Sequence, residues 1–330
     1  MAVSIADIQK LRKMTGAGLS DCKKALTETE GNFDKAVEII REKGQANAAK
    51  RSDRETSNGC VLVKYADNFG AIVALKCETD FVANGADYIK LTQDILDAAV
   101  AAKAKSLDEV KELTLADGTK VLDAVVARSG ITGEKMELDG YNFIEGENIS
   151  TYDHMGKHTL CTMVQTNKAA EEQAHAIAMQ VAAMKPMFLD EASVSQEFIE
   201  EEKKVAAEKT KQELVQKAVD AALKKAGINP AHVDSEEHME SNMGKGWITA
   251  EDVAKAKEII ATVSAEKAAN LPAQMIENIV KGRINRIYKE NCLLNQEFIQ
   301  DSKLSVADYL KAADKDLTVV DYKRFSLSAD

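Results

Sequence analysis

Side chains able to catalyse a reaction are present in this sequence, but they do not stand at the spacings that known catalytic sites require. A phosphate-binding loop needs the pattern GxxxxGK followed by Ser or Thr, in which backbone amides surround the phosphates and the hydroxyl holds Mg²⁺. The segment at Gly244, Lys245 and Gly246 lacks both the leading glycine and the hydroxyl residue. The chain also has no GxGxxG, GxSxG or HExxH pattern. We therefore predict no catalytic residue and no bound cofactor, and hence a protein that is not an enzyme.

The histidines and cysteines also lack a metal-binding spacing. His154 and His158 are four residues apart, but we expect them in a hairpin, where this spacing does not bring two ligands onto one helix face. His232 and His238 lie among acidic residues in a stretch that is typical of a solvated loop. The cysteines form no CxxC pair and are expected to be reduced, mostly buried thiols. They are Cys22, Cys60, Cys77, Cys161 and Cys292. We therefore predict no metal site.

One short segment could serve as a contact for another protein. It contains Asp80 and Phe81, where an apolar run typical of a buried strand ends. A large apolar ring beside a carboxylate at such a place could fill a pocket of a partner while the carboxylate accepts hydrogen bonds. In the alternative interpretation, Phe81 packs into this chain's own core and Asp80 caps the next helix. The residue types alone favour this second interpretation.

The composition favours a protein partner over nucleic acid. The net charge is −11, whereas affinity for phosphate backbones comes chiefly from clustered Lys and Arg. No stretch approaches the ~20 uninterrupted apolar residues that span a bilayer, and the first ten residues lack a signal-peptide profile. We therefore expect a cytoplasmic protein that binds neither nucleic acid nor membrane. The length of 330 residues indicates two or three structural units.

The first 44 residues predict three short helices. Apolar residues recur at helical spacing on both sides of a break at residues 16–18. Asn32 is suited to cap the third helix, which we expect to end at Gly44. Residues 45–57 predict a polar linker, whose basic residues are either a contact surface or, in the favoured interpretation, simply solvated. These basic residues are Lys50, Arg51 and Arg54.

A β-hairpin followed by a helix is predicted twice along the chain. The first copy has strands at residues 60–64 and 71–75 and a helix at 86–103. The second copy has strands at residues 149–152 and 159–165 and a helix at 171–184. After the first helix, Ser106 and Glu109 predict a capping box in which Glu109 reaches back to the Ser106 amide. Short strands at residues 292–294 and 318–327, around a helix capped by Ser305, are expected to complete the second sheet.

Residues 193–289 predict a mainly helical region. Ser193 is suited to cap a long helix that ends at Ala226. Residues 228–248 are polar and expected to be irregular, and two further helices follow. Helices of opposite direction joined in this way predict an antiparallel hairpin that projects from the body.

Several motifs resemble one family of proteins. Residues 11–26 read LRKMTGAGLSDCKKAL, and residues 79–83 read TDFVA. Both motifs are specific to bacterial translation elongation factor Ts, a family that the chain resembles over residues 1 to about 205 and about 270 to 327. Further matches are the segments at residues 152–156, 177–186, 282–284 and 295–298.

The resemblance implies an α+β fold with three parts. They are an N-terminal three-helix, UBA-like bundle, a core of two related hairpin-plus-helix α+β subdomains with antiparallel sheets, and an inserted helical coiled-coil hairpin. Our division of the chain, made from periodicity, agrees with this arrangement. It places the bundle at residues 1–44, the linker at 45–57, the first subdomain at 58–145, the second at 146–192 and 290–330, and the insertion at 193–289.

The resemblance also implies a guanine nucleotide exchange factor for the GTPase elongation factor Tu, bound in its GDP and nucleotide-free forms. In the family, the segment that matches Thr79, Asp80, Phe81 and Val82 inserts between helices of the GTPase and displaces the groups that hold Mg²⁺ near the nucleotide. The bundle grips the nucleotide-binding domain, and the second subdomain adds another contact. The matching residues here are Arg12 and Leu19 in the bundle and His154 in the second subdomain.

Two regions depart from the family pattern. Residues 209–268, with the lone Trp247, exceed the family's coiled-coil region, and the insertion is a candidate homodimer contact. Met155, Lys157 and His158 stand where the family favours glycines and an arginine. Two alternatives to the exchange factor remain: a helical docking protein of the translation machinery without exchange activity, and a metal-dependent hydrolase using the scattered histidines. The sequence favours the exchange factor.

Overall fold

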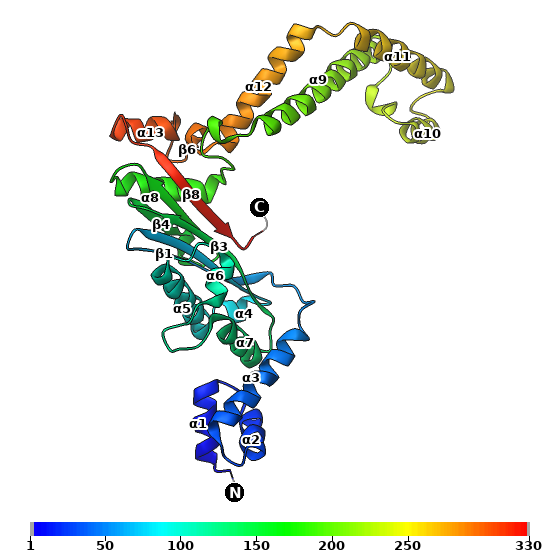
Figure 1. The fold of residues 1–330 in the computed structure, drawn as a ribbon. Helices are drawn as coiled ribbons and strands as arrows, with labels where there is room; N and C mark the ends of the chain where they lie inside the picture. The colour runs from blue at the N-terminus through cyan, green and yellow to red at the C-terminus, as the bar shows by residue number, and fades with distance from the viewer. Residues whose placement is uncertain (1–2, 329–330) are drawn as a thin grey trace. The chain divides into compact units, whose positions relative to one another are not determined.

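The computed structural model describes residues 3–328 (Figure 1). Contacts divide the chain into two compact units, one formed by Met1–Leu189 with Glu297–Asp330 and the other by Asp190–Gln296. The first unit contains all the strands and the first eight α-helices, together with the last one. This unit combines antiparallel sheets with helices that are interspersed among the strands, which confirms an α+β fold.

The first three helices are α1 (Ile5–Thr15), α2 (Leu19–Glu28) and α3 (Phe33–Ala49). As predicted, Asn32 caps α3, because its side-chain oxygen accepts a hydrogen bond from the Lys35 amide at 3.1 Å. A small apolar core holds the three together and consists of Leu11, Cys22, Ala25, Leu26 and Ala36.

The predicted end of the third helix at Gly44 is wrong, because α3 continues to Ala49. Gly44 instead lies beside helix α7 (Val121–Thr132), where a Cβ on Gly130 would be 3.7 Å from the Gly44 Cα. A Cβ at either position would meet the facing helix at ordinary van der Waals distance, and α3 continues past Gly44 in contact with α7. The ion pair between Arg41 of α3 and Asp123 of α7, at 3.0 Å, lies on the same contact.

The first sheet has the antiparallel order β1-β2-β3. Its strands are β1 (Asn58–Ala66), β2 (Phe69–Cys77) and β3 (Met136–Glu145). Asp67 and Asn68 join β1 to β2 with φ values of 52° and 60°, as a two-residue turn between twisted strands requires. The hairpin was predicted, whereas β3 was not. Between β2 and β3 lie α4 (Asp80–Ala83), α5 (Ala86–Ala102), α6 (Leu107–Glu112) and α7.

The predicted capping box at α6 is half right. The Ser106 hydroxyl accepts a hydrogen bond from the Glu109 amide at 3.1 Å, as expected. The Glu109 carboxylate, however, accepts from the amide of Lys105 at 2.7 Å and not from that of Ser106. The side chain reaches one residue beyond the expected amide, so the cap still satisfies two backbone donors.

The second sheet has the antiparallel order β4-β5-β8. Its strands are β4 (Ile149–Asp153), β5 (Leu160–Thr166) and β8 (Val319–Ser326), with α8 (Glu171–Met184) packed on β4 and β5. This confirms the second hairpin, its helix and the return of the C-terminal strand to this sheet. A two-stranded ribbon of β6 (Glu297–Phe298) and β7 (Asp301–Ser305) precedes α13 (Val306–Ala313), which Ser305 caps as predicted.

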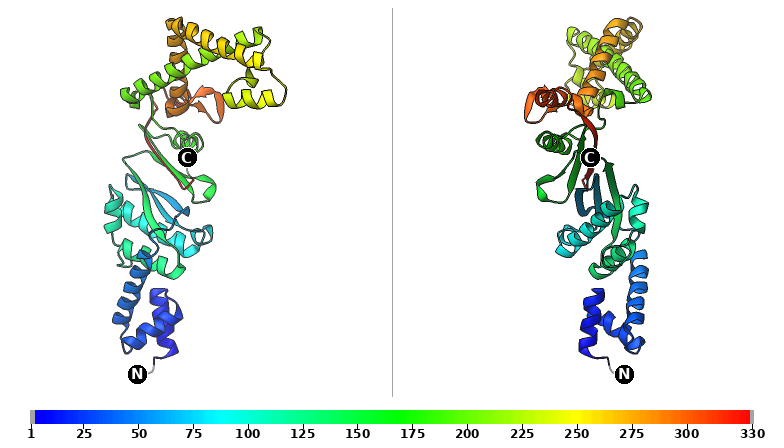
Figure 2. Two further views of the ribbon diagram at one scale, coloured as in Figure 1. Left: turned by 90° about the vertical axis from the view of Figure 1, so that its right-hand side faces the viewer. Right: turned by 60° about the vertical axis from the view of Figure 1, so that its left-hand side comes forward.

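The two sheets pack against each other (Figure 2). The cluster between them is formed by Val61, Ile72, Ala74, Ile144, Ile149, Cys161 and Met163. A second cluster lies on the other face of the first sheet, where Ala71, Val73 and Leu75 pack with α5. Strand β2 is therefore buried on both faces.

The unit Asp190–Gln296 is helical. Its longest helix, α9 (Gln196–Lys225), packs against both α11 (Ala250–Ala269) and α12 (Ala273–Asn291). The predicted cap at Ser193 is wrong, because Ser195 accepts the hydrogen bond from the Phe198 amide at 3.2 Å.

Two further expectations for this region are also wrong. Residues 228–248 contain α10 (Glu236–Gly244), which is capped by Ser235 and packs Met239 into a local apolar cluster. The predicted strand at residues 292–294 is a 3₁₀ turn, Leu293–Asn295. No helix within residues 3–328 combines the length and the apolarity that crossing a membrane requires.

Two glycine substitutions test this packing with opposite signs. A Cβ on Gly140 of β3 would lie 2.4 Å from the Phe325 ring, so Gly140→Ala is expected to lower the free energy of unfolding by about 2 kcal/mol. Gly282, inside α12, has open space around it, so Gly282→Ala is expected to raise the free energy of unfolding of the helical unit by about 0.5–1 kcal/mol. Chemical denaturation measures the free energy of unfolding of both variants. Equal changes in the two variants would contradict the sheet packing.

Candidate partner-binding site

Helix α4 follows the end of strand β2 after Glu78 and Thr79, and it presents Phe81 to solvent. Thr79 caps the helix by accepting a hydrogen bond from the Val82 amide at 3.3 Å, and Ala83 is buried against the core. The Phe81 side chain is 86% exposed. The interpretation in which Phe81 packs into the chain's own core is therefore wrong. Asp80 likewise does not cap the next helix, whose N-cap is Gly85.

The residues beneath α4 anchor it to the sheet. Cys77 is buried, and its thiol contacts the Thr79 carbonyl oxygen at 3.2 Å. Burial raises the pKa of the Cys77 thiol, so it stays protonated at neutral pH. The Tyr88 hydroxyl of α5 donates a hydrogen bond to the Leu75 carbonyl at 2.8 Å. These groups fix the end of β2 and leave the next residues as the exposed part.

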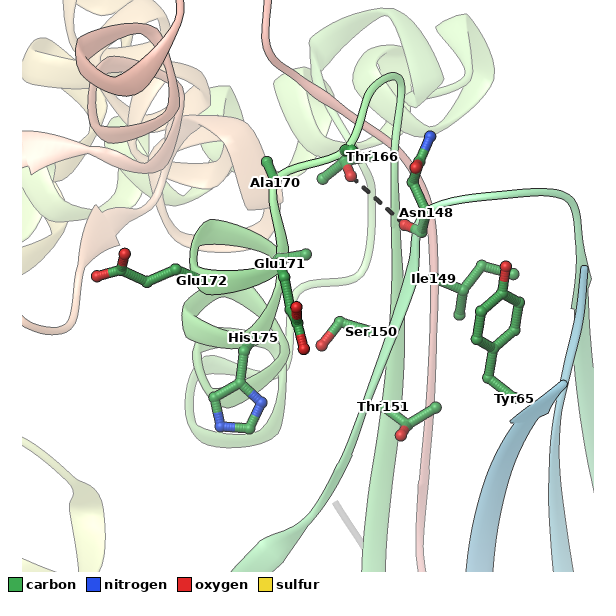
Figure 3. A pocket seen from close by; sticks show the side chains of 12 residues that line it. Tyr65, Asn148, Ile149, Ser150, Thr151, Thr166, Ala170, Glu171, Glu172 and His175 are labelled. Atoms are coloured by element: carbon green, nitrogen blue, oxygen red, sulfur yellow. Dashed lines mark hydrogen bonds between the residues drawn. The ribbon is translucent and has the colours of Figure 1, made fainter.

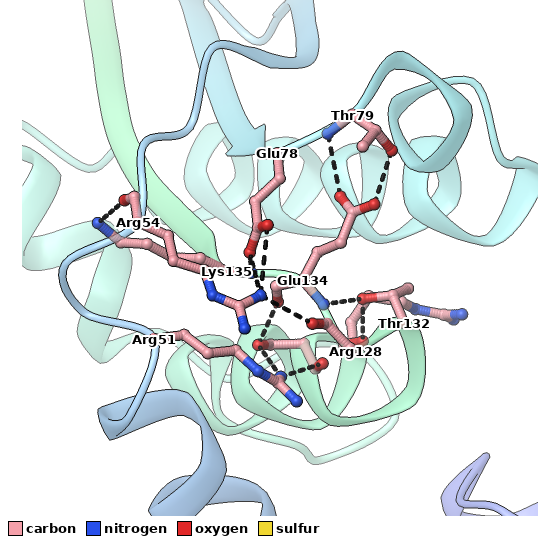
Figure 4. A network of polar contacts seen from close by, with 10 residues as sticks. Arg51, Arg54, Glu78, Thr79, Arg128, Thr132, Glu134 and Lys135 are labelled. Carbon is pink, nitrogen blue, oxygen red and sulfur yellow. Dashed lines mark hydrogen bonds and ion pairs between the residues drawn. The ribbon is translucent and has the colours of Figure 1, made fainter.

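A network of polar contacts surrounds this end of β2 (Figure 4). The Glu134 carboxylate accepts hydrogen bonds from the amide and the hydroxyl of Thr79. The Glu78 carboxylate accepts from the Lys135 amide and from Arg54, and these donors hold the pKa of Glu78 below its usual range. Two of the three basic residues of the linker are therefore bound to the chain's own groups: Arg54 to Glu78, and Arg51 to the carbonyl of Ser129 at 2.9 Å.

The predicted contacts in the N-terminal helices lie on both sides of the break at residues 16–18. Arg12 is exposed near the end of α1, and Leu19, 49% exposed, is the first residue of α2. Gly16 ends α1 with a φ of 67° and donates its amide to the Arg12 carbonyl at 2.7 Å. Met14 is also exposed, although it was not among the predicted contacts.

His154 lies in the turn between β4 and β5. Its Nδ1 is 3.1 Å from the Tyr152 hydroxyl. Next to it, Met155 has a φ of 58° and a side chain that is 71% exposed. His158 is held by Asp153, which accepts from the backbone amide at 3.1 Å and contacts Nδ1. The sequence pointed to His154 but not to Met155, since residue type does not reveal a left-handed backbone.

The predicted site residues therefore lie in three separate places of one unit. Residues 79–82 lie together on α4 and its N-cap, Arg12 and Leu19 lie in the N-terminal helices, and His154 lies in the β4–β5 turn. Within residues 3–328, no hydrogen bond or ion pair of the predicted residues joins one of these three places to another. They suit a partner that covers several surfaces at once.

An open hollow of about 870 Å³ lies beside β4 and the start of α8 (Figure 3). Tyr65, Ser150, Glu171 and His175 are among its lining residues. Over residues 3–328 there is no group of three His, Cys, Asp or Glu side chains that could hold a metal ion. The described residues that line the hollow therefore form no such metal-binding group.

Comparisons with known proteins agree with the resemblance. The family model of elongation factor Ts matches residues 78–226 and 216–329. The chain is 68% identical to elongation factor Ts of Bacteroides fragilis and 66% identical to that of Bacteroides thetaiotaomicron, in each case over the whole of both chains. It is 43% identical to elongation factor Ts of Porphyromonas gingivalis, again over both full lengths. The chain belongs to the elongation factor Ts family.

Proposed function

We propose that this exchange factor releases GDP from elongation factor Tu by placing residues 79–82, called here the insertion segment, beside the nucleotide site of the GTPase. The role of nucleotide exchange factor for elongation factor Tu follows from the family. The observation that carries the insertion is the 86% exposure of Phe81 on a helix that starts at a buried strand. An aromatic ring held in water by a fixed backbone is suited to fill a pocket of a partner.

Thermodynamic linkage explains how binding expels GDP. A protein that binds the nucleotide-free GTPase more tightly than the GDP form must weaken GDP binding by the same factor. A family member therefore needs no catalytic residue, and we propose that this chain performs no chemical reaction. The docking protein without exchange activity is not favoured, because the insertion segment of the family is present in full as Thr79, Asp80, Phe81 and Val82.

The rate of release needs its own source of free energy. A thousandfold acceleration of GDP release requires a barrier lower by roughly 4 kcal/mol. Mg²⁺ bridges phosphate oxygens of the bound nucleotide and holds it in place. We assign the loosening of this ion to Phe81, which displaces neighbouring groups by its volume, and to Asp80, whose carboxylate accepts hydrogen bonds from the partner.

Two further surfaces complete the proposed contact. Arg12 and Leu19 bind the nucleotide-binding domain of the GTPase, because both are exposed beside the same helix break. His154 and its neighbour Met155 bind the GTPase from the second sheet. These assignments give the bundle (1–44) and the two subdomains (58–145, and 146–192 with 290–330) to partner binding, and leave 45–57 as the linker.

The remaining proposals concern location and assembly. A translation factor that acts on elongation factor Tu works in the cytoplasm, where we place this chain. The net charge of −11 favours neither nucleic acid nor an anionic membrane surface as a partner. The insertion (193–289) is the candidate homodimer contact, and its exposed apolar side chains include Trp247.

Phe81→Ala tests the insertion segment. Since Phe81 is exposed in the free chain, its loss is expected to change the free energy of unfolding by less than about 0.5 kcal/mol. The same loss is expected to slow the stimulated release of a fluorescent GDP analogue at least about tenfold, as for an interface anchor. Val205→Ala, which removes exposed apolar surface from α9, is the control and should slow nothing. Parallel losses of stability and exchange would refute the insertion.

Met155→Gly tests the second contact, because its effects on stability and binding have opposite signs. Glycine relieves the left-handed backbone and is expected to raise the free energy of unfolding by roughly 0.5 kcal/mol. Removing the exposed side chain is expected to weaken binding to nucleotide-free elongation factor Tu about fivefold by calorimetry. Met275→Ala in α12 is the control. Unchanged affinity of Met155→Gly would show that the β4–β5 turn does not touch the partner.

A further inference from the structure

The insertion segment is too short to hold its own conformation. Helix α4 has four residues, fewer than an isolated helix needs to form in water. Its buried contact is Ala83 at one end, while Asp80 and Phe81 at the other end are exposed. Val82 also packs partly against the core, so packing holds the far end of the helix, and the residues just before it, Glu78 and Thr79, can fix its start.

Glu134 holds Thr79 with both carboxylate oxygens. One oxygen accepts from the Thr79 amide at 3.1 Å, and the other accepts from the Thr79 hydroxyl at 2.6 Å. The same hydroxyl oxygen accepts the cap hydrogen bond from the Val82 amide. Because the hydroxyl proton is committed to Glu134, its lone pairs are turned toward the helix. Glu134 thus orients the cap that starts α4.

The backbone of Glu134 is itself fixed by hydrogen bonds in the turn that follows α7. Its amide donates to the Thr132 hydroxyl at 3.3 Å, and its carbonyl accepts from the buried Ser129 hydroxyl. Arg51 of the linker donates to the carbonyl of this same Ser129 at 2.9 Å. The turn is therefore fixed on one side by α7 and on the other by the linker.

Glu78 makes a second, reciprocal connection between the same two segments. Its carboxylate accepts from the Lys135 amide, next to Glu134, and from Arg54 at 3.1 Å. The Lys135 ammonium donates in turn to the Arg54 carbonyl at 3.0 Å. Glu78 and Glu134 thus cross-link consecutive residues of one segment to consecutive residues of the other (Figure 4).

We propose that Glu134 and Glu78, backed by Arg51 and Arg54, form a clasp that positions the insertion segment for nucleotide exchange. None of the four touches the GTPase in this proposal, so they are positioning residues. The clasp orders the segment before binding. The entropy cost of this ordering therefore does not weaken binding and does not raise the barrier to GDP release. The linker then has a function beyond joining the bundle to the core. This inference rests on the proposed insertion of Phe81.

The first test is amide hydrogen exchange of the free, full-length chain, which does not depend on the GTPase. Glu134→Ala removes both acceptors and is expected to speed exchange of the Thr79 and Val82 amides about fivefold or more. The control is Asp139→Asn, which weakens a pair with Lys76 at 2.8 Å on the same sheet and should leave both amides unchanged. Unaltered exchange in Glu134→Ala would overturn the clasp.

The second test is a double-mutant cycle between Glu134 and Phe81, read as the GDP release rate at saturating amounts of the chain. Glu134→Ala is expected to lower this rate about fivefold, whereas in the Phe81→Ala background it should lower it no further. Glu134→Gln keeps one acceptor, so its GDP release rate should lie between those of the unaltered chain and Glu134→Ala. It replaces the alanine variant if that variant folds poorly. Equal losses in both backgrounds would overturn positioning through Phe81.

The two tests separate failure of the clasp from failure of the proposed function. If Phe81→Ala alone leaves the release rate unchanged, the insertion of Phe81 is wrong, and hydrogen exchange still decides whether the clasp orders the segment. If Phe81→Ala slows release and Glu134→Ala does not, the insertion stands and the clasp is wrong.

Discussion

Burial of strand β2 on both faces is the constraint on which the rest of the structure depends. Ala71, Val73 and Leu75 pack toward α5, while Ile72 and Ala74 pack toward the second sheet. The strand cannot shift by one residue without exchanging the two sets of side chains. Its C-terminal end is therefore a fixed point, and the chain continues from that point directly into α4. The core therefore sets where Phe81 lies in the fold, and the clasp beside it completes its positioning.

The fixed end of β2 matters because nucleotide exchange depends on where the Phe81 side chain is placed. Full burial of one aromatic side chain contributes roughly 2–3 kcal/mol, which is of the same order as the barrier reduction that fast GDP release needs. If the segment were mobile, the entropy cost of ordering it on binding would offset part of this free energy. The fold supplies order through the buried thiol of Cys77 below the segment and the carboxylates of Glu78 and Glu134 beside it.

The parts of the fold that the sequence predicted are those with local signals. The first hairpin follows from the apolar run of β2 and the turn residues Asp67 and Asn68, and α3 begins at its predicted cap, Asn32. Strand β3 was missed because Gly140 interrupts it, and this glycine is needed for a distant contact with the Phe325 ring. Gly44 misled for a different reason, since α3 continues through it in contact with α7.

The candidate site was predictable only in part, for a related reason. Hydrophobicity favoured a buried Phe81, and only the resemblance to a family indicated that its ring is turned outward. The clasp residue Glu134 lies 55 residues from Thr79 and belongs to no motif. The left-handed backbone of Met155 is likewise invisible in residue type. Contacts made by tertiary structure, and not by local pattern, decide these positions.

The release rate of a fluorescent GDP analogue from elongation factor Tu, measured with and without this chain across a range of Mg²⁺ concentrations, tests the central claim most directly. If the insertion segment acts by loosening Mg²⁺, the chain accelerates release strongly, and the acceleration shrinks as Mg²⁺ is raised. Detectable binding without any acceleration, or an acceleration that does not depend on Mg²⁺, would contradict the account.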